Sequence, residues 1–131
     1  MRRSRLDNYM KLASEQASKA ELNSFCDYAM GCVIVKKGVP IATGHNTRYN
    51  AKAYRLNRQH RKNLNTRFFS LHAEMQAVLS AKQELRGSSV FVMGHTIKNG
   101  HPLACSRPCK NCMTVLRQCG IRAVYYMSNG E

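Results

Sequence analysis

A histidine, a glutamate and two cysteines stand in this sequence at spacings that suit a catalytic metal site. Glu74 follows His72 by two positions, and Cys112 follows Cys109 by three. An imidazole and two thiolates are ligands that Zn²⁺ prefers, and three protein ligands leave the fourth tetrahedral position open for water. A carboxylate beside the histidine can reach that water without coordinating the metal. The pattern predicts a Zn²⁺ ion held by His72, Cys109 and Cys112, with Glu74 as the catalytic residue that transfers protons.

Two other interpretations of the cysteine pair have to be weighed. A C-x-x-C pair is often half of a four-ligand structural zinc site, and it can also be a redox pair. The other cysteines do not form a second C-x-x-C: Cys26, Cys32, Cys105 and Cys119. Cys105, four residues before Cys109, is the one spare thiol close enough in sequence to become a fourth ligand. The catalytic interpretation is favoured, because a purely structural site has no use for a carboxylate beside its ligand.

Length and cysteine usage limit the class of protein. With 131 residues the chain is expected to form one domain, residues 1–131, with a core that needs no disulfide bonds. No apolar segment of a signal peptide follows the basic residues 2–5, and no stretch is apolar enough for a membrane span. The six cysteines do not resemble an extracellular disulfide framework. We therefore expect an intracellular protein, cytoplasmic or nuclear, without membrane contact.

The charge of the chain favours polyanionic partners. It carries 21 lysines and arginines against 7 acidic residues, a formal net charge of +14. Residues 48–67 contain no acid, and their arginines are interleaved with aromatic residues. Arginine favours bidentate phosphate contacts and stacking on bases. We expect this segment to bind substrate phosphates, with a basic loop that has only a structural role as the alternative. Its predicted substrate contacts are Arg55, Arg58, Arg61 and Lys62.

The first half of the chain predicts a helix, a hairpin and a second helix. Apolar and small residues at steps of three and four predict an amphipathic helix that includes Leu6, Met10, Ala13, Ala17, Ala20 and Ser24. Residues 32–45 are typical of a β-hairpin with its turn at Lys37 and Gly38. A second helix is expected over residues 70 to about 85, so that His72 and Glu74 lie near its N-terminus.

The second half predicts two strands joined by a crossover helix. Residues 90–93 form a buried strand, and Asn99 and Gly100 a turn. Pro108 suits the first position of a helix that runs to Cys119, with Gly120 as its C-cap. The cysteine pair then lies at a helix N-terminus, where the dipole favours thiolates. Residues 121–127 form a last strand, parallel to residues 90–93. The alternation of strands and helices along the chain predicts a three-layer α/β domain.

These motifs resemble the cytidine deaminase-like superfamily over nearly the whole chain. The pairing of H-x-E with P-C-x-x-C marks zinc-dependent nucleobase deaminases. Residues 31–35, 44–46 and 72–75 are similar to the branch that holds deoxycytidylate deaminases and tRNA adenosine deaminases. The resemblance implies the same roles for the zinc ligands and Glu74 as the residues themselves predict. It adds Asn46, expected to contact the sugar, and Ala73 as substrate-binding residues.

The resemblance also implies a fold and a substrate class. The expected fold is a three-layer α/β/α cytidine deaminase-like fold with a mixed central sheet, whose first two strands form a hairpin and whose later strands are parallel. The usual fifth strand is expected to be absent or truncated after residues 121–127. The basic insert before the H-x-E motif is much longer than in bacterial tRNA adenosine deaminases. Some deoxycytidylate deaminases carry an insert here, which favours cytosine chemistry.

Three functions follow in order of preference. The first is zinc-dependent hydrolytic deamination of cytosine to uracil, in a nucleotide or in single-stranded nucleic acid, as DNA editing requires. The second is a tRNA-type deaminase that converts adenosine to inosine with the same zinc and glutamate. The third is a zinc-containing nucleic-acid-binding protein without activity. The expected partner is a nucleotide or single-stranded nucleic acid, and a homo-oligomer is compatible with the sequence.

Overall fold

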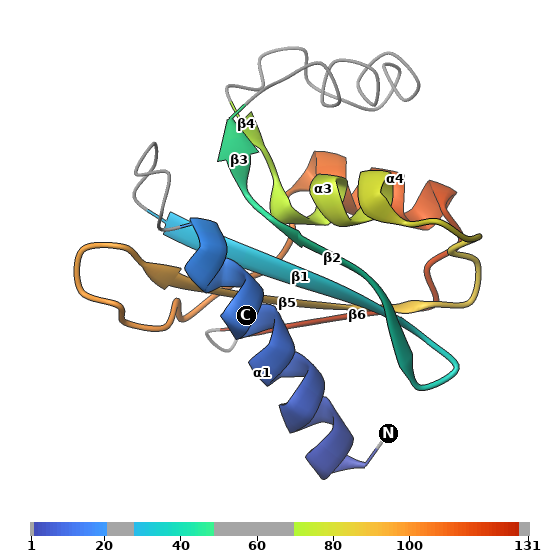
Figure 1. Cartoon of the computed structure of the whole chain (residues 1–131), viewed down its shortest axis with the longest axis horizontal. Helices are drawn as coiled ribbons and strands as arrows, with labels where there is room; N and C mark the ends of the chain where they lie inside the picture. Colours follow the sequence, from blue (N-terminus) through green and yellow to red (C-terminus); the bar gives the residue numbers. More distant parts are fainter. Residues whose placement is uncertain (1, 21–27, 49–69, 129–131) are drawn as a thin grey trace.

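Four strands form the central sheet in the order β2-β1-β5-β6 in the computed structural model, which describes residues 2–20, 28–48 and 70–128. β1 (Tyr28–Lys36) lies antiparallel to both β2 (Val39–His45) and β5 (Ser89–Thr96). β5 and β6 (Ala123–Tyr126) are parallel. The mixed sheet, the hairpin and the parallel pair are as expected (Figure 1). No fifth strand follows β6 in the sheet within the described part of the chain.

Helices cover both faces of this sheet. Alternate residues of a strand point to opposite faces, so Val33 and Ile34 of β1 enter different cores. Val33 packs with Ala13 of α1 (Arg3–Ala20), and Ile34 packs with Ala77 of α3 (Ala73–Ser80). α4 (Lys110–Gln118) lies on the same side as α3 and joins β5 to β6 (Figure 1). The three layers that the sequence predicted are confirmed.

Two glycines allow both helices to approach the sheet closely. A Cβ atom on Gly31 would clash with the carbonyl oxygen of Ala13 in α1. A Cβ atom on Gly44 would clash with the carbonyl oxygen of Ala73 in α3. No other residue type fits at these two positions without moving a helix, so glycine sets the spacing of both layers. For the site the second contact matters more, because α3 carries Glu74.

The hairpin turn forms where the sequence predicted it. Lys37 and Gly38 both have positive φ angles, 52° and 78°, between β1 and β2. Such a pair of left-handed residues matches the twist of two antiparallel strands. The first helix is also confirmed through Ala20, whereas Ser24 lies outside the described residues.

Two predicted helix boundaries were wrong. The helix expected over residues 70 to about 85 begins at Ala73 and ends at Ser80, because Ser70 and Leu71 form strand β4 (Ser70–Leu71) and Ala81 is extended. The Ser80 hydroxyl donates to the carbonyl oxygens of Thr43 and Ala77, which fixes the helix end against β2. In the last helix Cys109 is the N-cap, so Pro108 precedes the first helical position instead of occupying it.

A second, small sheet was not predicted. β3 (Thr47–Arg48) follows β2 directly and pairs antiparallel with β4, with Thr47 opposite Leu71. This pairing brings residue 46 and residue 72 to the same end of the domain, although the two lie far apart in the sequence (Figure 1). None of the helices described is long and apolar enough to cross a membrane.

Candidate active site

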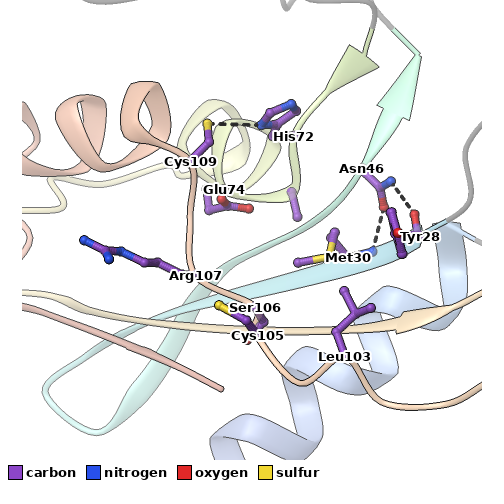
Figure 2. A pocket seen from close by; sticks show the side chains of 11 residues that line it. Tyr28, Met30, Asn46, His72, Glu74, Leu103, Cys105, Ser106, Arg107 and Cys109 are labelled. Carbon is purple, nitrogen blue, oxygen red and sulfur yellow. Dashed lines mark hydrogen bonds between the residues drawn. The ribbon is translucent and has the colours of Figure 1, made fainter. Parts of the chain in front are cut away.

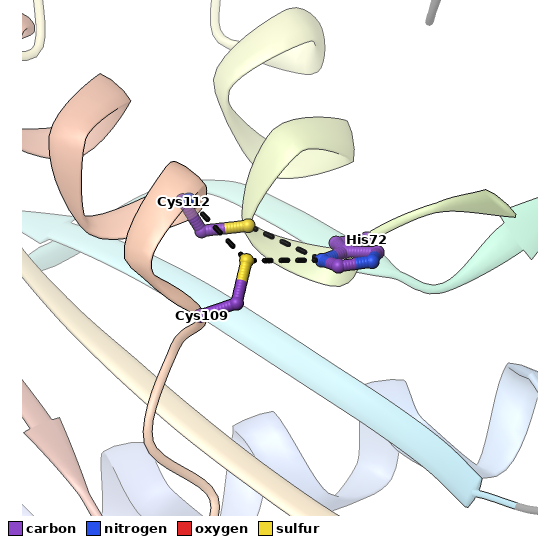
Figure 3. Close-up of side chains that lie close together, drawn as sticks. All are labelled: His72, Cys109 and Cys112. Atoms are coloured by element: carbon purple, nitrogen blue, oxygen red, sulfur yellow. Dashed lines mark hydrogen bonds between the residues drawn. The ribbon is translucent and has the colours of Figure 1, made fainter. Parts of the chain in front are cut away.

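The structure brings His72, Cys109 and Cys112 together at the N-termini of two helices (Figure 3). The Nδ1 atom of His72 lies 3.6 Å from the Sγ atom of Cys109 and 3.4 Å from that of Cys112. All three ligand atoms lie within 4.8 Å of one another. His72 is the N-cap of α3 and Cys109 the N-cap of α4, so both side chains project from extended backbone just before a helix.

These distances fit a tetrahedral Zn²⁺. Bonds of ~2.3 Å to sulfur and ~2.0 Å to nitrogen place neighbouring ligand atoms roughly 3.5–3.8 Å apart around a tetrahedral ion. The observed nitrogen–sulfur distances of 3.6 and 3.4 Å are close to that range. Donor chemistry agrees as well, since imidazole and thiolate are preferred zinc ligands. The three side chains therefore fit the metal that the sequence predicted.

The protein environment prepares one of the two thiols for a metal. A hydrogen bond from the Cys112 thiol, together with bonds from His72 and the Cys112 backbone N–H, lowers the pKa of Cys109 to about 4. The hydrogen bond to Cys109, with burial, raises the pKa of Cys112 well above its usual value. The hydrogen bond to Cys109 also raises the pKa of His72. Without metal the pair of thiols thus shares one proton, and Cys109 carries the charge.

Glu74 lies in the wall of a cavity next to this cluster. The cavity has a volume of about 500 Å³, and His72, Cys109 and Asn46 also line it (Figure 2). The side chain of Glu74 is buried, with 4% of its surface exposed. Burial raises the pKa of this carboxyl, so the carboxyl keeps its proton to a higher pH than an exposed glutamate does. Glu74 is not a member of the three-ligand group, as a proton-transfer role requires.

Asn46, another residue that lines the cavity, is fixed by the backbone of β1. Its Oδ1 atom accepts a hydrogen bond from the Met30 backbone N–H, and its Nδ2 atom donates to the Tyr28 carbonyl oxygen. The preceding residue is also held, because the His45 backbone N–H donates to Oε1 of Gln76 in α3 at 2.6 Å. These bonds connect β1, β2 and α3, and they place Asn46 in the cavity that contains Glu74.

Part of the cavity wall was missed by the sequence analysis. The loop before Cys109 is fixed by Ser106, whose buried hydroxyl donates to the Val92 carbonyl oxygen and accepts from the Met127 backbone N–H. The residues of the wall that were not predicted are Tyr28, Met30, Leu103, Cys105, Ser106 and Arg107. Cys105 lines the cavity but lies outside the three-ligand group (Figure 2). Side chains of a strand alternate between the two faces of the sheet, so Tyr28 and Met30 share one face. This alternation is the signal in the sequence that could have identified them as wall residues.

The remaining predicted substrate residues divide into two groups. Ala73 is fully buried and lines the cavity between His72 and Glu74. The four basic residues of the insert lie outside the described part of the chain: Arg55, Arg58, Arg61 and Lys62. The structure does describe β3 and β4, and their pairing places Thr47 and Leu71 opposite each other, next in sequence to the cavity residues Asn46 and His72.

Solved structures share this fold. The dCMP deaminase from the cyanophage S-TIM5 in apo form is 23% identical, with a TM-score of 0.65 over 95% of this chain and 83% of that chain. A diaminohydroxyphosphoribosylaminopyrimidine deaminase/reductase from Thermotoga maritima is 25% identical, with a TM-score of 0.55 over 92% of this chain and 28% of that chain. Cytidine deaminase from Mycobacterium tuberculosis is 17% identical, with a TM-score of 0.54 over 95% of this chain and 89% of that chain. No match was found among curated proteins.

The sequence itself identifies the family. The model of the "Cytidine and deoxycytidylate deaminase zinc-binding region" matches residues 3–128. The protein therefore belongs to this family of zinc-binding deaminases, and the resemblance found in its motifs is confirmed. Zn²⁺ is the cofactor of such a site, and His72, Cys109 and Cys112 are the residues whose geometry fits it.

Proposed function

We propose that this protein deaminates cytosine to uracil by hydrolysis, in a nucleotide or in single-stranded nucleic acid, and that residues 1–131 act as one deaminase domain. The observation that carries the proposal is the position of Glu74. Its buried carboxyl, with a raised pKa, lines the same cavity as His72 and Cys109 but is separate from the three-ligand group. A structural zinc site has no need for a carboxyl in this position.

The residues around the cavity would divide the reaction between them. His72, Cys109 and Cys112 would hold Zn²⁺, which when bound lowers the pKa of a water molecule and so supplies hydroxide near neutral pH. Glu74 would accept the proton of the attacking water on a carboxylate oxygen and deliver it to N3 of the cytosine ring. Glu74, deprotonated again, would take the remaining proton from the hydroxyl on C4 and pass it to the exocyclic nitrogen. The C4–N4 bond then breaks, ammonia leaves, and the oxygen on C4 becomes the carbonyl of uracil.

Asn46 and Ala73 would position the substrate. Asn46 lines the cavity and is held by hydrogen bonds to two backbone groups of β1, so its amide is preorganised for a sugar hydroxyl. Ala73 carries no side chain beyond Cβ, which leaves room for a base between His72 and Glu74. Preorganised contacts of this kind contribute to the rate by holding the reacting atoms in place.

The choice of cytosine rests on three observations. The family description names cytidine and deoxycytidylate deaminases. The cyanophage enzyme that shares the fold has been solved in complex with dCMP and dUMP. The third is the long insert before His72, which some deoxycytidylate deaminases also carry. The net charge of +14 supports a phosphate-bearing substrate, and the insert residues Arg55, Arg58, Arg61 and Lys62 would contact its phosphates.

One experiment separates the candidate functions. The zinc-loaded protein is incubated with dCMP, cytidine, single-stranded DNA, RNA and a tRNA, and the products are scored as uracil or inosine by mass spectrometry. Uracil from dCMP or from a single strand supports the proposal and identifies the substrate class. Inosine without uracil would replace it with adenosine deamination. No product from any substrate, with zinc retained and nucleic acid bound, would leave the non-catalytic binding protein as the function.

A further inference from the structure

A second cavity, separate from the candidate active site, is lined by three cations. It has a volume of about 360 Å³ and lies between α1, the β1–β2 turn and the beginnings of β5 and β6. Arg5, Lys37 and Arg122 line it from three different elements, and no acidic side chain of the described residues does. Only one cation, Arg107, lines the described wall of the cavity that contains Glu74.

The topology of the sheet explains why these cations meet. β5 and β6 are parallel, so both strands begin at the same end of the sheet. β1 is antiparallel to β5, so β1 ends there. The Arg122 backbone N–H donates to the Ser88 carbonyl oxygen at 2.8 Å, which fixes the approach to β6 beside the approach to β5. The Tyr9 hydroxyl donates to the Gly38 carbonyl oxygen at 2.9 Å, which fixes α1 to the turn.

Aromatic rings form the floor of this cavity. The ring of Phe91 stacks on that of Tyr125 with centroids 4.8 Å apart and an interplanar angle of 7°, and Tyr9 packs against Phe91 at 4.9 Å. Phe91 is fully buried, whereas Gly38 and Gly87 at the rim are exposed and have open space where a side chain would stand. The cavity therefore has a rigid apolar floor below a basic rim.

The three cations are not neutralised by the described part of the protein. The ion pair found among the described residues joins Arg86 to Glu84, 3.4 Å apart and both exposed. Three like charges around one hollow repel each other, and an anion in the hollow removes that cost. Guanidinium groups bind phosphate in a bidentate manner and lysine adds a mobile point charge, so phosphate is the anion that this set of donors suits best.

The basic cavity and the candidate active site lie on different faces of the sheet. Val35 and Phe91, which line the basic cavity, pack in the core cluster that contains Ala13 of α1. Ala73, which lines the candidate active site, packs in the cluster on the other face with Ala77 of α3. We infer that Arg5, Lys37 and Arg122 form a phosphate-binding site separate from the active site. The phosphate comes either from a free phosphate-bearing ligand or from the backbone of a nucleic acid strand, and the inference holds whether or not the protein deaminates cytosine.

The test uses the full-length protein and two probes without cytosine. Pyrophosphate represents a free ligand, and an oligothymidylate of about 15 nucleotides represents a strand. The cavity variant combines Arg5→Gln, Lys37→Gln and Arg122→Gln. The control variant combines Lys11→Gln, Lys82→Gln and Lys98→Gln, which removes the same charge from exposed positions outside this cavity. Circular dichroism shows whether each variant is folded, and the amide resonances of Gly38 and Gly87 report binding in the unmodified protein.

The site predicts a difference between the two variants. The cavity variant should bind a probe at least ~10-fold more weakly, because it lacks charge-assisted hydrogen bonds that the control keeps. If the cavity variant binds both probes more weakly, the site takes a free phosphate-bearing ligand. If it binds only the oligonucleotide more weakly, the site takes the backbone of a nucleic acid strand. Equal effects in both variants, or unshifted Gly38 and Gly87 amides with both probes, would overturn the inference and leave only the general field of a basic protein. The amide test uses the unmodified protein, so it remains valid even if the cavity variant does not fold. Turnover of dCMP, measured in the same samples, tests the proposed deamination separately.

Discussion

The Oδ1 atom of Asn46 accepts a 2.8 Å hydrogen bond from the backbone N–H of Met30, sixteen positions earlier in the chain. The amide nitrogen of the same side chain donates to the Tyr28 carbonyl oxygen at 2.9 Å. Asn46 is buried, with 7% of its surface exposed, and it lines the cavity that contains Glu74. One side chain thus connects β1 to the end of β2 and also stands in the candidate active site.

Asn46→Ala should therefore reduce both stability and substrate use. Two backbone groups of β1 lose their partner, so the free energy of unfolding should fall by about 1–3 kcal/mol. The catalytic efficiency, kcat/KM, on an active substrate should fall while the zinc content is unchanged. Denaturant unfolding and steady-state kinetics measure the two effects. A destabilised variant with unchanged kinetics would mean that Asn46 only holds the hairpin and does not contact the substrate.

Glu74→Ala should abolish turnover without removing zinc. A positioned acid or base contributes ~10² to 10⁴-fold to a rate, and Glu74 would act more than once per cycle, so the decrease should be at least in that range. Glu84→Ala is the matched control, because Glu84 is an exposed carboxylate that lies outside the cavity. Kinetics and elemental analysis of both variants check this. Substantial residual deamination by Glu74→Ala would assign proton transfer to another group.

The parts of the fold and site that the sequence predicted depend on local rules. The turn at Lys37 and Gly38 follows from the residues that tolerate positive φ angles, and the metal ligands follow from short spacings around His72 and Cys109. The wrong helix end at Ser80 has a different origin. Leu85 is buried like a helical core residue, but it packs from a non-helical connection after α3. Apolar spacing alone does not separate these two cases.

The parts that the sequence did not predict depend on contacts between distant segments. Ser106 enters the cavity wall because its hydroxyl bonds to the backbone of β5 and to the residue after β6. The pairing of Thr47 with Leu71, which brings the two sides of the site together, joins strands that are only two residues long. Neither arrangement leaves a periodic pattern in the sequence. Both follow from tertiary packing, which local propensity does not determine.

Zinc content should distinguish the three ligands from the fourth thiol near them. Cys109→Ala and Cys112→Ala each remove one of three donors and should release most of the metal. Cys105→Ala should retain it, because Cys105 lines the cavity but lies outside the ligand group. Elemental analysis of the purified variants measures zinc per chain. Zinc-free Cys105→Ala protein would make Cys105 a fourth ligand, close the coordination shell and contradict the catalytic assignment.

Zinc affinity should increase with pH near neutrality. Cys109, with a pKa of about 4, is already a thiolate, whereas the raised pKa of Cys112 keeps its proton in the metal-free protein. Coordination requires both thiolates, so binding must release the Cys112 proton. Each released proton raises the apparent affinity about tenfold per pH unit. The dependence disappears only above the pKa of Cys112. Chelator competition at two pH values one unit apart measures it, and equal affinities would show that Cys112 is ionised without metal.

The basic insert should bind phosphates and leave the chemistry to the cavity. Changing Arg55, Arg58, Arg61 and Lys62 together to glutamine removes up to four cations that can pair with phosphates. The salt slope of single-strand binding should therefore fall by up to about 0.7 for each phosphate that is no longer neutralised. The matched control changes four exposed basic residues elsewhere to glutamine: Lys11, Lys82, Lys98 and Arg117.

Turnover at saturating substrate should change little in the insert variant, because Glu74 and the zinc ligands are intact. Binding of a labelled oligonucleotide over a range of salt concentrations gives the slope for each variant. An insert variant with the slope of the unmodified protein would mean that the insert does not touch the strand. A free nucleotide would then become the better candidate substrate, because its single phosphate needs only one or two basic residues to hold it.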